Sequence, residues 1–112
     1  MGMRESTYFV LVALRGERLH GYAIIKRAAE LSGGRVTLAA GTLYAALDRL
    51  AGSGYVVDDG EEIVNGRARR YYRLTGPGEE ALVAEAVRMA AAAQVVQDSG
   101  RAARIAPVVR PA

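Results

Sequence analysis

Residues 37–54, TLAAGTLYAALDRLAGSG, and residues 55–75, YVVDDGEEIVNGRARRYYRLT, contain the patterns that decide the fold. In the first segment, apolar residues recur at the spacing of one helix face until a pair of glycines ends the run. These apolar residues are Leu43, Ala46, Leu47 and Leu50. The second segment is rich in strand formers, and its central Asn65-Gly66 pair tolerates the positive φ angles of a type I′ turn. The sequence therefore predicts a helix with Thr37 as its N-cap, followed by a two-stranded hairpin.

The Asn65-Gly66 turn also predicts the register of the hairpin. Pairing outward from the turn joins Val64 with Arg67, Glu62 with Arg69, Glu61 with Arg70 and Val57 with Leu74. Alternate residues of a strand share one face of the sheet, so Val57, Tyr72 and Leu74 are expected to face the helices.

Two shorter helical patterns precede this region, and one long pattern follows it. Residues 7–14 are apolar nearly all round, and residues 20–32 place apolar side chains at spacings of two to four, so both segments predict helices. After Thr75, a good N-cap, the sequence favours helix to Asp98, a length of roughly 33 Å at about 1.5 Å per residue. Residues 99–112 show no such period, and we expect them to be mobile.

Three short helices followed by a hairpin is the element order of a winged helix-turn-helix, whose third helix enters the DNA major groove. The expected fold class is therefore mainly α with a two-stranded β wing and a long C-terminal dimerisation helix. Residues 1–75 would form the DNA-binding domain, residues 76–98 the dimerisation helix, and residues 99–112 a mobile tail.

Composition excludes several classes of protein. The chain has 112 residues, enough for one domain, and it lacks both an apolar run of ~20 residues and a secretory leader pattern, so we expect a cytoplasmic protein. Without Cys and with a single His, it offers no thiolate nucleophile, no Cys-based zinc site and no multi-His metal site. His20 has no nucleophile placed beside it by sequence and is interpreted as ending the loop before the second helix. We therefore expect no enzyme, no cofactor and no metal.

The charge distribution is more informative than the net charge of +3. The first 98 residues contain 12 basic and 12 acidic side chains, so the whole excess lies in the last 14 residues. Within the neutral part, four arginines fall within seven residues that include no acid, namely Arg67, Arg69, Arg70 and Arg73. This local cluster, on the second hairpin strand, is the candidate contact to a polyanion.

The sequence also resembles the PadR-like family of transcriptional regulators. The resemblance rests on Leu19-His20-Gly21-Tyr22 with Ile24, on Gly41-Thr42-Leu43-Tyr44 with Leu47, Arg49, Leu50 and Gly54, and on Arg69-Arg70-Tyr71-Tyr72-Arg73-Leu74-Thr75 with Gly78. It covers residues 6–98, and it departs from the family in having Ala45 where a proline is usual. The resemblance implies a homodimer joined through the C-terminal helix together with the first helix, as in the short subfamily. It also implies a central cavity that accepts flat, apolar or phenolic effectors in some members.

The candidate DNA-binding residues lie on the third helix, on the wing and at the start of the second helix. They are Thr37, Gly41, Thr42 and Tyr44, then Arg67, Arg69 and Arg70, then Tyr22 and Lys26. Small residues and hydroxyls on the outward helix face would let the backbone approach base edges and phosphates. Three alternatives stay open: Thr37 as a plain N-cap, Tyr44 as a rim residue covering the core, and the wing arginines as surface pairs with Glu61 and Glu62.

The long helix carries an apolar stripe that is dominated by small side chains. Its candidate dimerisation residues are Leu82, Ala86, Met89, Ala93 and Val96. The sequence thus predicts a homodimeric, sequence-specific DNA-binding regulator that binds double-stranded DNA at an inverted repeat, a repressor by analogy with the family. Whether a small molecule releases it stays open. The alternative is a winged-helix protein-protein interaction module without specific DNA binding.

Overall fold

The computed structural model describes the backbone of residues 2–105 and the side chains of residues 2–100. Its elements follow the predicted order, with one additional strand. They are α1 (Glu5–Ala13), β1 (Leu19–His20), α2 (Gly21–Leu31), α3 (Ala40–Gly52), β2 (Val56–Val64), β3 (Arg67–Leu74) and α4 (Gly76–Ile105). The predicted fold class, mainly helical with a β wing and a long C-terminal helix, is confirmed.

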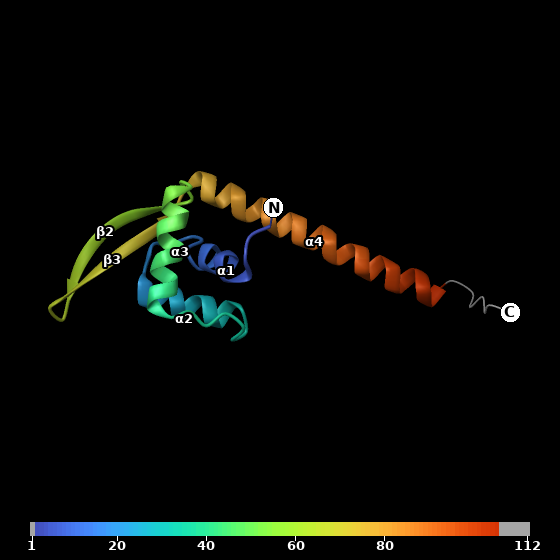
Figure 1. Ribbon diagram of the computed structural model, residues 1–112, viewed down its shortest axis with the longest axis horizontal. Coiled ribbons are helices and arrows are strands. Elements are labelled where there is room, and N and C mark those ends of the chain that lie inside the picture. The colour runs from blue at the N-terminus through green and yellow to red at the C-terminus, as the bar shows by residue number, and fades with distance from the viewer. Residues whose placement is uncertain (1, 106–112) are drawn as a thin grey trace.

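The core lies where α1, α2 and α3 meet the base of the hairpin. Its largest fully buried side chains come from all three helices: Val10, Leu11, Leu14, Ile24, Leu43 and Leu47. Val56 of β2 and Leu82 of α4 complete the same cluster. The base of the hairpin and the start of α4 are thereby fixed to the helices, while the outer hairpin and most of α4 project from opposite sides of the molecule (Figure 1).

The helices α2 and α3 begin in different ways. The imidazole Nδ1 of His20 accepts a hydrogen bond from the backbone N–H of Ala23 at 3.4 Å and caps α2. Helix α3 begins at Ala40 after Ala39 and has no side-chain cap, so the predicted N-cap role of Thr37 is wrong. The physical reason is that Val36 is buried and Leu38 packs against the core, so the helix begins only after Ala39, whose backbone is extended.

The hairpin confirms the predicted turn and the outer register. Asn65 and Gly66 have φ angles of 52° and 75°, and Val64 with Arg67, Glu62 with Arg69 and Glu61 with Arg70 are the observed pairs. Between Asp58 and Glu61 the register shifts by one residue at a β-bulge, where Gly60 has φ 96°.

The bulge overturns the predicted inner pairing. Leu74 pairs with Val56 instead of Val57. Val56 is 3% exposed and lies in the core, whereas Val57 is 36% exposed. One extra residue in a strand moves each side chain beyond it to the opposite face of the sheet. The expected orientation of Val57 toward the helices is therefore wrong.

The sheet also has a third strand that the sequence did not predict. β1 pairs antiparallel with β3 through Leu19 with Tyr72 and His20 with Tyr71, which gives the order β1-β3-β2. The wing is therefore a two-stranded hairpin built on a three-stranded base.

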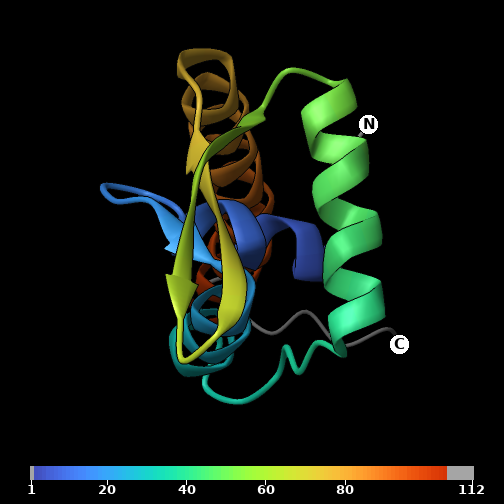
Figure 2. The same ribbon diagram turned by 90° about the vertical axis from the view of Figure 1, so that its left-hand side faces the viewer.

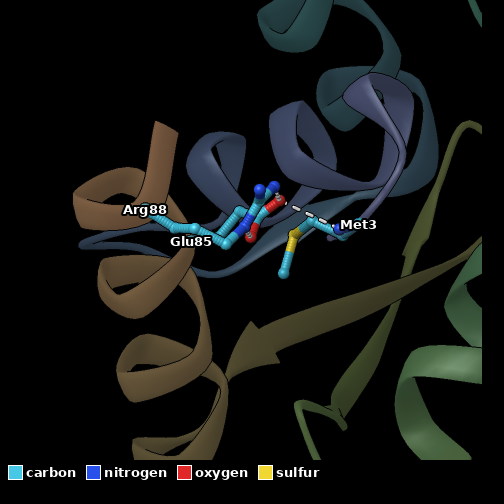
Figure 3. A network of polar contacts seen from close by, with 3 residues as sticks. All are labelled: Met3, Glu85 and Arg88. Atoms are coloured by element: carbon cyan, nitrogen blue, oxygen red, sulfur yellow. Dashed lines mark hydrogen bonds and ion pairs between the residues drawn. The ribbon is translucent and has the colours of Figure 1, made fainter. Parts of the chain in front are cut away.

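Up to Gly100, where the description of side chains ends, helix α4 is joined to the body along its first turns. Thr75 caps it as predicted, because its hydroxyl accepts from the N–H of Gly78 at 3.0 Å. The guanidinium of Arg15, just after α1, pairs with Glu79 at 2.6 Å. The buried Glu85 carboxylate accepts from the backbone N–H of Met3 at 2.9 Å and from Arg88 at 2.8 Å (Figure 3).

The last part of α4 differs from the expectation in length. The helix runs to Ile105, seven residues beyond the expected end at Asp98, so residues 99–105 of the predicted tail are helical. Residues 106–112 of that tail lie outside the described residues. From Val87 to Gly100 every side chain is exposed. Within the part of the chain that the structure describes, no helix is apolar over enough length to span a membrane.

Candidate nucleic-acid interface

The outward face of α3 is exposed at its N-terminal end. Leu43, Leu47 and the other predicted core residues are buried, while Gly41 and Thr42 are exposed and Tyr44 is 45% exposed. A methyl group placed on Gly41 would meet no atom within 4 Å, so another molecule has open access to the backbone there. Such access is what a recognition helix needs in order to reach base edges.

A groove of about 550 Å³ joins α3 to the wing and to the start of α2. It is lined by His20, Gly21, Tyr22, Tyr44, Val64, Asn65, Arg67, Ala68, Arg69 and Arg70. Figure 2 shows the hairpin standing beside α3. Gly21 allows the phenol of Tyr44 to approach closely, since a Cβ at this position would lie 2.5 Å from its Oη atom.

The wing arginines differ in their partners. Arg70 pairs with Asp58 at 3.3 Å, and Arg73 pairs with Asp59 at 3.7 Å. Among the described residues, neither Arg67 nor Arg69 forms an ion pair with a carboxylate. Their guanidinium groups are exposed and available for an anion.

These ion pairs bear on the alternative that the wing arginines are only surface partners of Glu61 and Glu62. Glu62 lies opposite Arg69 in the ladder, but the two side chains form no ion pair. Arg70 lies opposite Glu61 in the ladder, but its ion-pair partner is Asp58, which lies on β2 three residues before Glu61. Of the three predicted wing residues, Arg67, Arg69 and Arg70, only Arg70 is therefore neutralised by a carboxylate of the described residues. That carboxylate belongs to Asp58 and not to Glu61.

Two aromatic groups of this region have shifted pKa values. Burial lowers the pKa of His20, and the nearby positive charge of Arg69 lowers it further. The imidazole is accordingly neutral near pH 7, which leaves Nδ1 free to accept the hydrogen bond that caps α2. Burial raises the pKa of Tyr72, so its phenol keeps its proton at the base of the wing.

The structure brings five of the predicted DNA-binding residues into one groove: Tyr22, Tyr44, Arg67, Arg69 and Arg70. Thr37, Gly41 and Thr42 are exposed along the segment that leads into α3 and its first turn, whereas Lys26 is exposed on α2 outside the groove lining. Sequence reasoning did not include His20, Asn65 or Ala68 in the groove. The Asn65-Gly66 turn signal could have indicated Asn65, because it places that residue at the wing tip.

The predicted dimerisation residues fall into two groups. Leu82 is 3% exposed and packs in the core of its own chain, which overturns its assignment to a dimer seam. Ala86 is half-buried, while Met89, Ala93 and Val96 are exposed. The exposed part of the stripe thus begins at Met89, about two turns later than predicted.

Comparison with known proteins identifies the family. The model of the transcriptional regulator PadR-like family matches residues 10–84, which include the helices α2 and α3 and the whole wing. The chain belongs to the PadR-like family. This PadR-like chain is therefore a transcriptional regulator by membership.

Solved structures of PadR-like proteins resemble it over most of its length. A PadR family transcription regulator from Clostridium difficile is 25% identical, with a TM-score of 0.70 over 85% of this chain and 97% of that one. A PadR family transcriptional regulator from Eggerthella lenta is 26% identical, with a TM-score of 0.67 over 82% of this chain and 78% of that one.

A third PadR-like structure contains nucleic acid. Bacillus subtilis PadR in complex with operator DNA is 27% identical, with a TM-score of 0.62 over 71% of this chain and 45% of that one. Among proteins with a curated function, none matches this chain.

Proposed function

We propose that this PadR-like chain is a homodimeric repressor that binds an inverted-repeat operator through α3 and the wing. The observation that carries the proposal is a pair of arginines, Arg67 and Arg69, which form no ion pair with the carboxylates of the described residues and lie in one groove with Tyr22 and Tyr44. The solved complex of Bacillus subtilis PadR with operator DNA supports it, since that chain is 27% identical.

Each group has a separate role in this proposal. The exposed residues at the start of α3, Gly41, Thr42 and Tyr44, enter the major groove, where the small residue permits close approach and the hydroxyls bond bases or phosphates. Arg67 and Arg69 contact the backbone or the minor groove beside it. Arg70 contributes less, because Asp58 already neutralises it at 3.3 Å.

The dimer is proposed from α4. From Val87 to Gly100 its side chains are exposed, and Val96 is 72% exposed on the stripe that Met89 and Ala93 continue. The exposed valines form part of an apolar stripe that the rest of this chain does not cover in the described residues, and pairing with a second copy would bury them. A dimer also places two recognition helices one DNA turn apart, roughly 34 Å, as an inverted repeat requires.

DNA binding is tested by fluorescence anisotropy on the DNA upstream of the protein's own coding sequence, with a scrambled duplex as competitor. We expect Arg67→Ala and Tyr44→Ala each to weaken binding about 5- to 100-fold, since a phosphate or base contact contributes about 1–3 kcal/mol. The matched control is Arg35→Ala, which removes an exposed arginine already paired with Glu5 at 2.9 Å. Binding that ignores sequence and survives both variants would refute the site.

The dimer is tested by light scattering on two adjacent valines of nearly equal exposure. Val96 lies on the stripe and is 72% exposed, while Val95 is 65% exposed and points about 140° away from the stripe centre at 100° per residue. We expect Val96→Glu to produce monomer and Val95→Glu to leave the dimer intact. A wild-type chain that is monomeric at micromolar concentration would favour the alternative of a protein-protein interaction module.

Release by a small molecule is the least specified part of the proposal. A groove of about 500 Å³ between the N-terminal arm, α1, the end of α2 and α4 is lined by aromatic Tyr8 and Phe9. Its arginines, Arg35 and Arg88, already pair with Glu5 at 2.9 Å and with Glu85 at 2.8 Å, so its charges are balanced. This chemistry suits a flat, uncharged phenolic compound. Titration of the operator complex with phenol is expected to release DNA in wild type and less in Tyr8→Leu; cyclohexanol, which has the same hydroxyl on a ring that is not flat, is the control.

A further inference from the structure

The face of the sheet that points away from the core carries one side chain that crosses all three strands. Arg18 lies directly before β1, which pairs with β3. Its guanidinium carbon stands 4.2 Å from the ring centroid of Tyr71 on β3. Its Nη1 then donates to the backbone carbonyl oxygen of Asp59 on β2 at 3.1 Å. The outermost strands are thus joined through a single arginine.

The site on β2 is available because of the bulge. The register is interrupted between Asp58 and Glu61, and Asp59 has no partner in the ladder with β3. A bulge leaves a residue outside the regular pairing, so its carbonyl needs another donor. The charged guanidinium of Arg18 supplies that donor, in the class of hydrogen bonds that are stronger than neutral ones.

Tyr71 is held from both sides at this point. The ring of His20 meets it edge-on with centroids 5.6 Å apart, while Arg18 covers its face. Figure 2 shows β1 and the loop before it at the base of the hairpin, on the side opposite α3. Beyond Tyr71 the outer wing has little further support, since the side chains from Asn65 to Arg70 are exposed.

We propose that Arg18 is a positioning residue for DNA recognition: it holds the wing in a fixed direction relative to α3 and does not itself contact DNA. This inference rests on the proposed function of the wing. Arg67 lies four residues along β3 from Tyr71, a distance of about 13 Å at 3.3 Å per residue. A rotation of the wing by about 10° at its base would therefore move Arg67 by about 2 Å. Donor–acceptor distances in hydrogen bonds vary by only about 0.5 Å, so this movement would break a contact between Arg67 and DNA.

The first experiment measures the wing without DNA. Because the chain has no Cys, a pair introduced by Glu62→Cys on the wing and Arg49→Cys on α3 can be spin-labelled alone, and unlabelled protein in excess isolates distances within one chain. We expect a narrow distance distribution in the parent and a distribution broader by about 2 Å or more with Arg18→Ala or Tyr71→Leu. Distributions that coincide in all three proteins would overturn the proposal.

The second experiment is a double-mutant cycle on operator affinity. Arg18→Ala and the charge-neutral Tyr71→Leu should each weaken binding about fivefold, the equivalent of one cation–π contact. In a background of Arg67→Ala with Arg69→Ala, Arg18→Ala should have no further effect, since the wing then has nothing to position. An equal loss in both backgrounds would assign Arg18 to a direct phosphate contact and overturn the proposal.

The two experiments separate this proposal from the proposed function. If the wild-type protein fails to bind operator DNA, the proposed function falls, and the spin-label distances alone decide whether Arg18 holds the wing. Thermal unfolding of Arg18→Ala should stay near the wild-type midpoint, because both contacts lie on the exposed face of the sheet. Arg35→Ala serves as the control for loss of one surface charge in both experiments.

Discussion

Replacing Arg67 and Arg69 together by alanine is expected to change how steeply operator binding depends on salt. Each arginine that neutralises a phosphate releases condensed counterions, so the slope of log affinity against log salt is about −0.9 per contact on duplex DNA. Neither guanidinium forms an ion pair among the described residues, so each is free to act in full. The two losses should therefore add.

The size of the change in slope also indicates how many chains bind one operator. Two chains on one operator lose four contacts in the double variant, and the slope becomes shallower by about 3.6, whereas one chain loses about 1.8. When salt is raised from 50 to 200 mM, the affinity of the wild type then falls about 150-fold more than that of the variant if a dimer binds. If a monomer binds, it falls about 12-fold more. The same titration thus tests the wing contact and the stoichiometry.

The assay is an anisotropy titration of labelled operator at several concentrations of potassium glutamate. The matched control is Arg27→Ala with Arg35→Ala, which removes the same charge from arginines that already pair with carboxylates at 2.9 Å. Its slope should stay within about 0.5 of wild type, because paired surface charges contribute little. Equal slopes for the wing variant and the control would refute the reasoning.

Three further predictions concern stability and geometry. Val56→Ala should cost about 2 kcal/mol of unfolding free energy and Val57→Ala under about 0.5 in urea denaturation, since only the former is buried; equal costs would contradict the bulged register. The contacts of Glu85 hold its pKa at about 2, below 4.5, so its contribution to stability is present above pH 4.5 and lost as pH falls toward 2; Glu85→Gln should flatten that part of the pH profile of thermal unfolding. Gly21→Ala must displace the phenol of Tyr44, because the new Cβ would lie 2.5 Å from its Oη atom, so operator affinity should fall while the unfolding midpoint changes little; a rise in affinity would contradict this.

Local patterns predicted the elements of this chain well, because each depended on neighbours in the sequence. The Asn65-Gly66 turn fixed the outer register, which the structure repeats pair by pair. The burial of Leu43, Leu47 and Leu50 likewise follows from the 3.6-residue period of α3.

The features that escaped prediction depend on contacts between distant segments. β1 has only two residues, too few for any period, and it exists because β3 offers an edge to Leu19 and His20. The bulge had a local signal in Gly60, a glycine inside a strand pattern, but the choice of Val56 for the core is made by packing against the helices.

The candidate site was predicted in part for the same reason. The arginine cluster is visible in the sequence, but the pairing of Arg70 with Asp58 and the freedom of Arg69 depend on the bulge and on side-chain geometry. Leu82 shares its apolar stripe with exposed residues, so periodicity alone could not separate a core residue from a seam residue. The helix also continues past Gly100, where one glycine costs only about 1 kcal/mol relative to alanine.

The way α4 leaves the body constrains how this protein can evolve. Between Gly76 and Gly100 its last buried side chain is Glu85, and each residue inserted or deleted after that point turns the remaining helix by about 100° and moves it by about 1.5 Å. A change of seven residues, about two turns, keeps the same face toward a partner, whereas a change of one or two does not. In the proposed dimer, α4 can therefore change in length by about seven residues and keep its pairing face. Each such step moves each DNA-binding half about 10 Å along its own α4 without altering a residue that contacts DNA.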